Sequence, residues 1–154
     1  MSNPYIIVIS CVTTETVMVS SPSIFYKADE VHLFRYIRDP RSKKSKLYRD
    51  HYNEVVRKVS TSLPSCRIIE HSDEPVYEVN RMARSLDKLY CRISKDNDDF
   101  RILDNLSSGP SEFAAALGYS RTSIPAWSCL RYPRGNTPCP RPRWRSSTTT
   151  TAYP

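Results

Sequence analysis

The sequence predicts an α/β fold in which a parallel sheet carries helices on both faces. Its length of 154 residues suits one domain with a core of its own. Continuous runs of β-branched and aromatic residues recur along it, which is typical of strands covered on both faces. Segments between these runs keep the apolar spacing of helices. Strands that alternate with helices in this way indicate a parallel sheet with right-handed crossovers.

Two strands are expected early in the chain, at residues 5–9 and 31–37, where β-branched and aromatic residues dominate. The mostly polar residues 10–14 are expected to form a loop after the first strand. Residues 15–27 are ambiguous, because apolar positions at helical spacing are interrupted by Pro22. A proline allows a helix on one side of it only, or with a kink.

The middle of the chain predicts a basic loop, two helices and a short strand. The loop at residues 38–46 could contact an anionic ligand or nucleic acid, or could be a solvated connection. An amphipathic helix is expected at residues 47–63 and a strand at residues 67–71. The next helix is expected to start directly after this strand, with Ser72 or Asp73 as its N-cap.

The stretch at residues 100–117 predicts a strand, a tight turn and a helix. An apolar run leads into Ser107-Ser108-Gly109, and the following helix opens with Ser111 as its expected N-cap. Such a turn leaves backbone N–H groups unpaired at the helix start, where the helix dipole adds a positive field. The turn therefore suits a phosphate or another anion. The alternative is an ordinary strand–helix connection without a ligand.

The expected topology brings two loops together. Ligands of doubly wound sheets bind beyond the carboxyl ends of the strands, where the strand order reverses. We expect an order of about 3-2-1-4, so the reversal lies between the first and the fourth strand. The loops that meet there, residues 10–15 and 107–112, are both rich in small hydroxyl residues. Topology and composition together predict a site for an anion or a nucleotide between these loops.

Several segments resemble CARF domains, the Rossmann-like sensor domains associated with CRISPR systems. The segments that carry the resemblance are residues 6–15, 26–33, 48–59 and, above all, 105–116. Residues 105–109 match the family pattern N-[IL]-S-[ST]-G-T-K, whereas Pro110 and Ser111 replace its threonine and lysine. The sequence is similar to archaeal CARF-like transcriptional regulators, in which such a domain precedes a winged helix-turn-helix domain that binds DNA.

The resemblance implies that residues 1–120 form a sensor domain for a cyclic oligoadenylate or a similar nucleotide. It also implies a homodimer, because CARF domains pair about a twofold axis with the ligand across the pair. The residues implied to contact the ligand lie in the loops after the first and fourth strands. They are Ser10, Thr13, Thr14, Ser107, Ser108 and Gly109, and the expected N-cap residue Ser111 adds a hydroxyl beside them.

An enzymatic alternative follows from the same resemblance, because some CARF domains cleave their own cyclic ligand without a metal. Ser107, Ser108 and Thr14 could supply hydrogen bonds, but no base or lysine is placed beside them. His71 is expected at the end of the third strand, away from the reversal, and no nucleophile elbow supports a Ser-His-Asp site. We therefore expect ligand sensing without catalytic residues, cofactor or metal.

Residues 121–154 differ in composition from the rest of the chain. Of the net charge of +7, most lies here: residues 1–120 carry 17 basic and 16 acidic side chains, whereas residues 121–154 carry six arginines and no acid. This proline-rich segment cannot bury enough apolar surface, so we expect a disordered tail. The abrupt change suggests a truncated or frame-shifted member of the family. The alternative is nucleic-acid binding through charge and stacking, with Arg131, Arg134, Arg141, Arg143 and Arg145 as the contacts.

The remaining features indicate a cytoplasmic protein. No apolar run approaches the ~20 residues of a membrane span, and the N-terminus lacks the pattern of a signal peptide. The five cysteines are scattered, odd in number and contain no C-x-x-C pair, so we expect reduced thiols and no zinc site.

Overall fold

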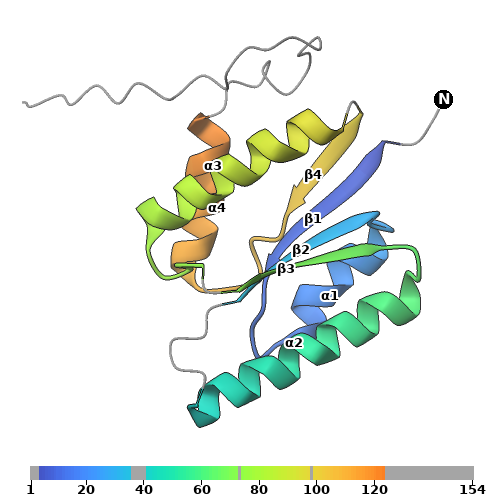
Figure 1. The fold of residues 1–154 in the computed structure, drawn as a ribbon, viewed down its shortest axis with the longest axis vertical. Coiled ribbons are helices and arrows are strands. Elements are labelled where there is room, and N and C mark those ends of the chain that lie inside the picture. Colours follow the sequence, from blue (N-terminus) through green and yellow to red (C-terminus); the bar gives the residue numbers. More distant parts are fainter. Residues whose placement is uncertain (1–3, 36–40, 73, 98, 124–154) are drawn as a thin grey trace, which may run out of the picture.

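The computed structural model describes residues 4–35, 41–72, 74–97 and 99–123, in which strands and helices alternate strictly (Figure 1). Neighbouring strands are all parallel, and their order in the sheet is β3-β2-β1-β4. The predicted α/β class, the parallel sheet and its strand order are therefore confirmed. The elements are β1 (Tyr5–Cys11), α1 (Thr16–Phe25), β2 (Glu30–Arg35), α2 (Lys43–Ser62), β3 (Arg67–Ser72), α3 (Val79–Asp96), β4 (Phe100–Asp104) and α4 (Ser111–Ser123).

Both faces of the sheet are covered, and β1 shows this most directly. Its side chains alternate between the faces, as in any strand. Ile7, Ile9 and Cys11 pack in the cluster with residues of α3 and α4, whereas Val8 and, just after the strand, Val12 pack in the cluster with residues of α1 and α2. Figure 1 shows the same division of the helices between the two sides. Both faces of β1 therefore pack against an apolar layer, which explains the continuous apolar run at residues 5–9.

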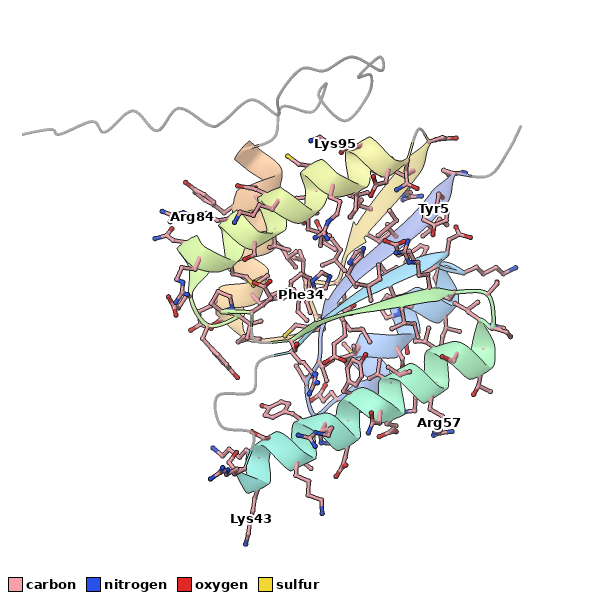
Figure 2. All side chains as sticks on the ribbon, viewed as in Figure 1. Tyr5, Phe34, Lys43, Arg57, Arg84 and Lys95 are labelled. Carbon is pink, nitrogen blue, oxygen red and sulfur yellow. The ribbon has the colours of Figure 1, made fainter. Side chains whose placement is uncertain are left out.

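The helices turn their charged side chains away from the sheet. In Figure 2, Lys43 and Arg57 extend outward from α2, and Arg84 and Lys95 extend outward from α3. Phe34 of β2 lies instead between the sheet and the pair of helices α3 and α4, where it is 1% exposed. This separation is what an amphipathic helix needs in order to bury one face and solvate the other.

The first strand is longer than expected. Ser10 and Cys11 belong to β1 rather than to the following loop, because they pair with Leu33 and Phe34 of β2. Both residues are also buried between neighbouring elements. The loop after β1 therefore begins at Val12.

Two helices begin at other residues than expected. The residues 43–46, assigned to the basic loop, form the first turn of α2, because Ser42 caps this helix by accepting the N–H of Ser45 at 3.1 Å. α3 begins at Val79 and not directly after Ser72. A turn comes first, in which the N–H of Glu78 donates to the carbonyl of Pro75 at 2.8 Å.

The last described helix, α4, begins at Ser111, so Ser111 is its first residue and not its N-cap. The N–H groups of Phe113 and Ala114 close the first turn on the carbonyl of Pro110, at 3.0 and 3.2 Å. The helix continues to Ser123, beyond the expected end at residue 117.

Some predicted features lie outside the described residues. They are the end of the second strand and part of the basic loop (residues 36–40), Asp73, and the tail from residue 124, with its Arg131, Arg134, Arg141, Arg143 and Arg145. Within the described ranges, no helix is both long and apolar enough to cross a membrane.

Candidate functional site

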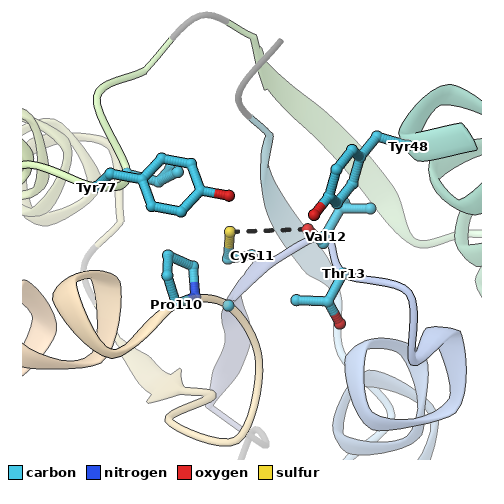
Figure 3. A pocket seen from close by; sticks show the side chains of 8 residues that line it. Cys11, Val12, Thr13, Tyr48, Tyr77 and Pro110 are labelled. Atoms are coloured by element: carbon cyan, nitrogen blue, oxygen red, sulfur yellow. Dashed lines mark hydrogen bonds between the residues drawn. The ribbon is translucent and has the colours of Figure 1, made fainter. Parts of the chain in front are cut away.

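A pocket of about 230 Å³ lies at the carboxyl edge of the sheet, beside the reversal of strand order between β1 and β4. Four segments form its walls: the loop after β1, the first turns of α2, the connection between β3 and α3, and the turn before α4 (Figure 3). The lining residues are Cys11, Val12, Thr13, Tyr48, Val76, Tyr77, Gly109 and Pro110.

The floor of the pocket depends on a close approach between the turn before α4 and the end of β1. A Cβ atom at Gly109 would lie 2.6 Å from the Cβ of Cys11 and 3.2 Å from Cδ1 of Phe113. The backbone φ of Gly109 is +95°, a conformation that other residues rarely adopt. Glycine is therefore required here both for its backbone conformation and for its lack of a side chain.

Asn105, directly after β4, connects the end of β1 and helix α1 to the turn before α4. Its Nδ2 donates to the hydroxyl of Ser10 at 3.2 Å and to the carbonyl of Met18 at 2.8 Å. Its Oδ1 accepts the N–H of Ser107 at 3.2 Å. These bonds join β1, α1 and the turn before α4 through one side chain that is 7% exposed.

The carbonyl of Met18 needs this donor because of Pro22. The residue four positions after Met18 would normally donate its N–H to that carbonyl, but a proline has none. Pro22 lies inside α1, and Asn105 replaces the missing donor. The ambiguous segment at residues 15–27 is thus resolved as a helix that contains its proline.

Two of the predicted ligand-contact residues have their hydroxyl groups inside the fold. The Ser108 hydroxyl accepts the N–H of Cys11 at 3.1 Å and donates to the carbonyl of Asn105 at 3.0 Å. Ser10 accepts the bond from Asn105, and both serines are 0% exposed. In this structure they position the loops around the pocket.

The other predicted residues lie nearer to solvent. Thr13 and Gly109 line the pocket itself. Thr14 and Ser107 are exposed on the surface of the same two loops, and Ser111 is exposed at the start of α4. The structure therefore brings only part of the predicted set together at the pocket.

The pocket carries no charged side chain among its described lining residues. Burial raises the pKa of the Cys11 thiol to about 12, so the thiol stays protonated at neutral pH. Burial also raises the pKa of Tyr77, and the neighbouring Tyr48 hydroxyl adds to that rise. At the start of α4, the Glu112 carboxylate accepts the Ser111 hydroxyl at 3.1 Å. This acid opposes the positive field that was expected to attract an anion there.

Tyr48 and Tyr77 are pocket residues that the sequence analysis did not select. Tyr48 lies within the apolar pattern of α2, where an aromatic residue is usually core. Tyr77 belongs to the connection before α3, and Figure 3 shows its hydroxyl facing that of Tyr48 across the pocket. The position of Tyr77 could have been predicted from the topology, because the connection after β3 leaves the same edge of the sheet as the loops after β1 and β4.

A second polar cluster lies on β2 and β3, outside the residues that line the pocket. Nε2 of His32 bonds to Oε1 of Glu30 at 2.7 Å, and Nδ1 of His32 bonds to Nε2 of His71 at 2.8 Å. His71 also stacks on Phe34, with the ring centroids 4.3 Å apart. Among the described residues, no group of three or more histidines, cysteines and acids is arranged to hold a metal ion.

We expect the histidine pair to make the fold less stable in acid. Burial lowers the pKa of His32 and of His71 from 6.5 to about 4, with Arg92 adding to both shifts. Between these values the unfolded chain binds more protons than the folded chain, so the free energy of unfolding decreases as pH falls. Urea denaturation at several pH values between about 7 and 4 measures this slope.

Two variants separate this effect from general acid denaturation. His71→Phe keeps an aromatic ring on Phe34 but removes one titrating group, so its stability should depend less steeply on pH. His51→Gln removes a histidine outside the pair and should keep the slope of the wild type. A His71→Phe slope as steep as that of the wild type contradicts the prediction.

Comparison with known proteins bears on the fold. No family model and no curated protein matches the sequence. The structure is similar to that of Enterococcus italicus Csm6 bound to cyclic hexa-2'-fluoro-hexa-dAMP, with a TM-score of 0.63 and 15% sequence identity. The match covers 76% of this chain and 31% of the Csm6 chain, so this chain spans less than half of that protein. The likeness shows that the two proteins share this α/β fold.

Proposed function

We propose that this chain is a sensing module that binds a cyclic oligoadenylate, or a closely related nucleotide, at the carboxyl edge of its sheet. The observation that carries the proposal is the pocket between the loops after β1 and β4, where the strand order reverses. The resemblance of residues 105–109 to the CARF motif supports it. So does the fold shared with Csm6, whose solved structure contains cyclic hexa-2'-fluoro-hexa-dAMP.

The predicted site residues take two roles in this proposal. Ser10 and Ser108 hold the loops in place through their buried hydrogen bonds. The residues that contact the ligand are Thr13 and Gly109 in the pocket and Thr14, Ser107 and Ser111 on the surface beside it.

The wider role that we propose is that of a sensor for a transcriptional regulator in the cytoplasm. It rests on the resemblance to CARF-like regulators. The module acts as a homodimer that encloses the ligand, and DNA is contacted through a separate helix-turn-helix domain or through the basic residues 121–154.

Binding is proposed to occur without cleavage. The only thiol that lines the pocket among the described residues, Cys11, has a pKa raised to about 12 and is no nucleophile at neutral pH. The other polar side chains of the lining are the hydroxyls of Thr13, Tyr48 and Tyr77. Chromatography of the ligand after incubation with the protein separates binding from cleavage, since linear products reveal cleavage.

Calorimetric titration of the full chain with cyclic tetra- and hexa-adenylate tests the proposed function. Saturable binding of one of the two rings is expected. A protein that is folded by circular dichroism but binds neither ring contradicts the proposal. Size-exclusion chromatography with light scattering, with and without ligand, tests the dimer.

Thr13→Val is expected to weaken binding by about 2- to 12-fold, the worth of one hydrogen bond. The substitution keeps the shape of a side chain that lines the pocket and removes its hydroxyl, together with the bond that this hydroxyl accepts from the N–H of Glu15 at 3.3 Å. Thr61→Val, on the exposed last turn of α2, is the matched control and should bind like the wild type. Equal affinities of the two variants would place Thr13 outside the ligand contacts.

A further inference from the structure

We propose that Tyr48 and Tyr77 form an aromatic clamp that holds one adenine base of the ligand in the pocket. The inference rests on the proposed function and adds to it the part of the ligand that enters the pocket and the two residues that hold it. The observation behind it is that two tyrosines from different elements line an uncharged pocket and point their hydroxyl groups toward one another across it (Figure 3).

The size and lining of the pocket fit a base better than a phosphate. Its volume of about 230 Å³ lies below the range of about 300–1,000 Å³ found for drug-sized ligands, so it takes a fragment of a nucleotide. A phosphate buried there would carry a charge with no cationic side chain in the described lining, which is costly. A base is flat and neutral, and aromatic rings stack on any base.

The start of α4 gives a second reason to keep phosphates out of the pocket. Glu112 lies in the first turn of this helix and accepts the Ser111 hydroxyl at 3.1 Å. A phosphate near this turn meets a carboxylate, and like charges at short range repel. We therefore place the sugar–phosphate part of the ligand on the solvent side, where Thr14 and Ser107 are exposed.

Tyr77 is held in position although its ring reaches solvent. The residue is 53% exposed, whereas the preceding Val76 is 1% exposed and anchored in the core with α3 and α4. Backbone bonds from Val76 to Glu74 and from Glu78 to Pro75, both 2.8 Å, fix the turn that carries it. A large aromatic ring on a fixed turn at the mouth of a pocket loses little freedom when a ligand stacks on it.

Tyr48 is positioned by helix α2. It lies in the second turn of α2, whose start is capped by Ser42 through the N–H of Ser45 at 3.1 Å. The Tyr77 phenol is able to donate a hydrogen bond at neutral pH, because burial raises its pKa above the ordinary value near 10. The clamp thus offers rings for the face of a base and hydroxyls for its edge.

Calorimetric titration of the full chain with cyclic hexa-adenylate, adenosine and ribose 5-phosphate tests the clamp. Tyr77→Ala and Tyr48→Ala are expected to weaken binding of the ring and of adenosine by about 5- to 150-fold each, the range of one lost base–aromatic stack. Tyr77→Phe keeps the stack and should change affinity much less. Tyr26→Ala is the matched control, because Tyr26 is 44% exposed and follows α1, at the opposite edge of the sheet. It should bind like the wild type.

The outcomes separate the clamp from the proposed function. Binding of cyclic hexa-adenylate that is unchanged in both alanine variants overturns the clamp and leaves the proposed function standing. Adenosine binding that Tyr77→Ala weakens supports the clamp, even if the cyclic ring does not bind and the proposed function fails. Binding of ribose 5-phosphate but not adenosine by the wild type overturns the clamp, as does binding of none of the three probes.

Discussion

Replacing Gly109 with alanine is expected to lower the free energy of unfolding by about 2–4 kcal/mol. The new methyl group meets the Cβ of Cys11 at 2.6 Å, and the backbone of residue 109 would stay at a φ of +95° that alanine disfavours. The Cβ of Cys11 is fixed to the backbone of β1 and is not the end of a flexible side chain, so the turn before α4 must move away from β1. Because this contact forms the floor of the pocket, ligand binding should be lost together with stability.

Gly118→Ala is the matched control for this substitution. Gly118 lies in α4 with no atom within 4 Å of an added Cβ, so the methyl group enters open space. The higher helix propensity of alanine should raise the free energy of unfolding by about 0.5–1 kcal/mol. Urea denaturation of the two variants should therefore give changes of opposite sign in the free energy of unfolding. Two changes of the same sign would contradict this account of Gly109.

Asn105→Ala is expected to cost about 2–4 kcal/mol of stability, because the side chain makes three hydrogen bonds in a buried position. The loss exceeds the worth of the bonds alone, since the Met18 carbonyl is left without its donor inside α1. Asn80→Ala, on the exposed side of α3, is the control and should change stability by less than about 0.5 kcal/mol.

A double-mutant cycle with Pro22→Ala tests the reason for this cost. Alanine at position 22 restores an N–H four residues after Met18, so the helix supplies its own donor. In the Pro22→Ala background, Asn105→Ala should therefore lower the free energy of unfolding by about 0.5–1.5 kcal/mol less than it does in the wild type. Strictly additive effects would show that Asn105 stabilises the fold for reasons other than the missing bond of the proline.

Stability and ligand binding both depend on the walls of the pocket, but through different residues. Gly109 and Asn105 position the turn before α4, and Tyr48 and Tyr77 approach the pocket from α2 and from the connection after β3. A variant at Tyr77 removes a ring that is half exposed and leaves the core intact. A variant at Asn105 loosens the walls of the pocket, so binding and stability should change together there and separately at Tyr77.

The sequence was sufficient for the class and topology of the fold because both depend on patterns that repeat along the chain. The run at residues 5–9 is apolar at every position, which indicated burial on both faces before any contact was known. Right-handed crossovers then left few ways to arrange four parallel strands. The order β3-β2-β1-β4 agrees with that expectation.

Helix starts were predicted less well, because they depend on single hydrogen bonds. Because Ser42 caps α2, this helix already includes residues 43–46. Because residues 74–78 form a turn, α3 begins only at Val79. A basic or acidic composition does not reveal either bond. The same holds for Pro22, whose place inside α1 depends on a donor from Asn105, more than eighty residues later in the chain.

The candidate site, like the fold, was predicted only in part from the sequence. The sequence by itself determined which loops meet at the carboxyl edge of the sheet, since topology follows from the alternation of strands and helices. Only the tertiary structure decided the role of each hydroxyl, because Ser10 and Ser108 turn inward to partners that are distant in sequence. It also brought Tyr48 and Tyr77 to one pocket from separate elements, and side chains that meet only through packing leave no spacing in the sequence by which to find them.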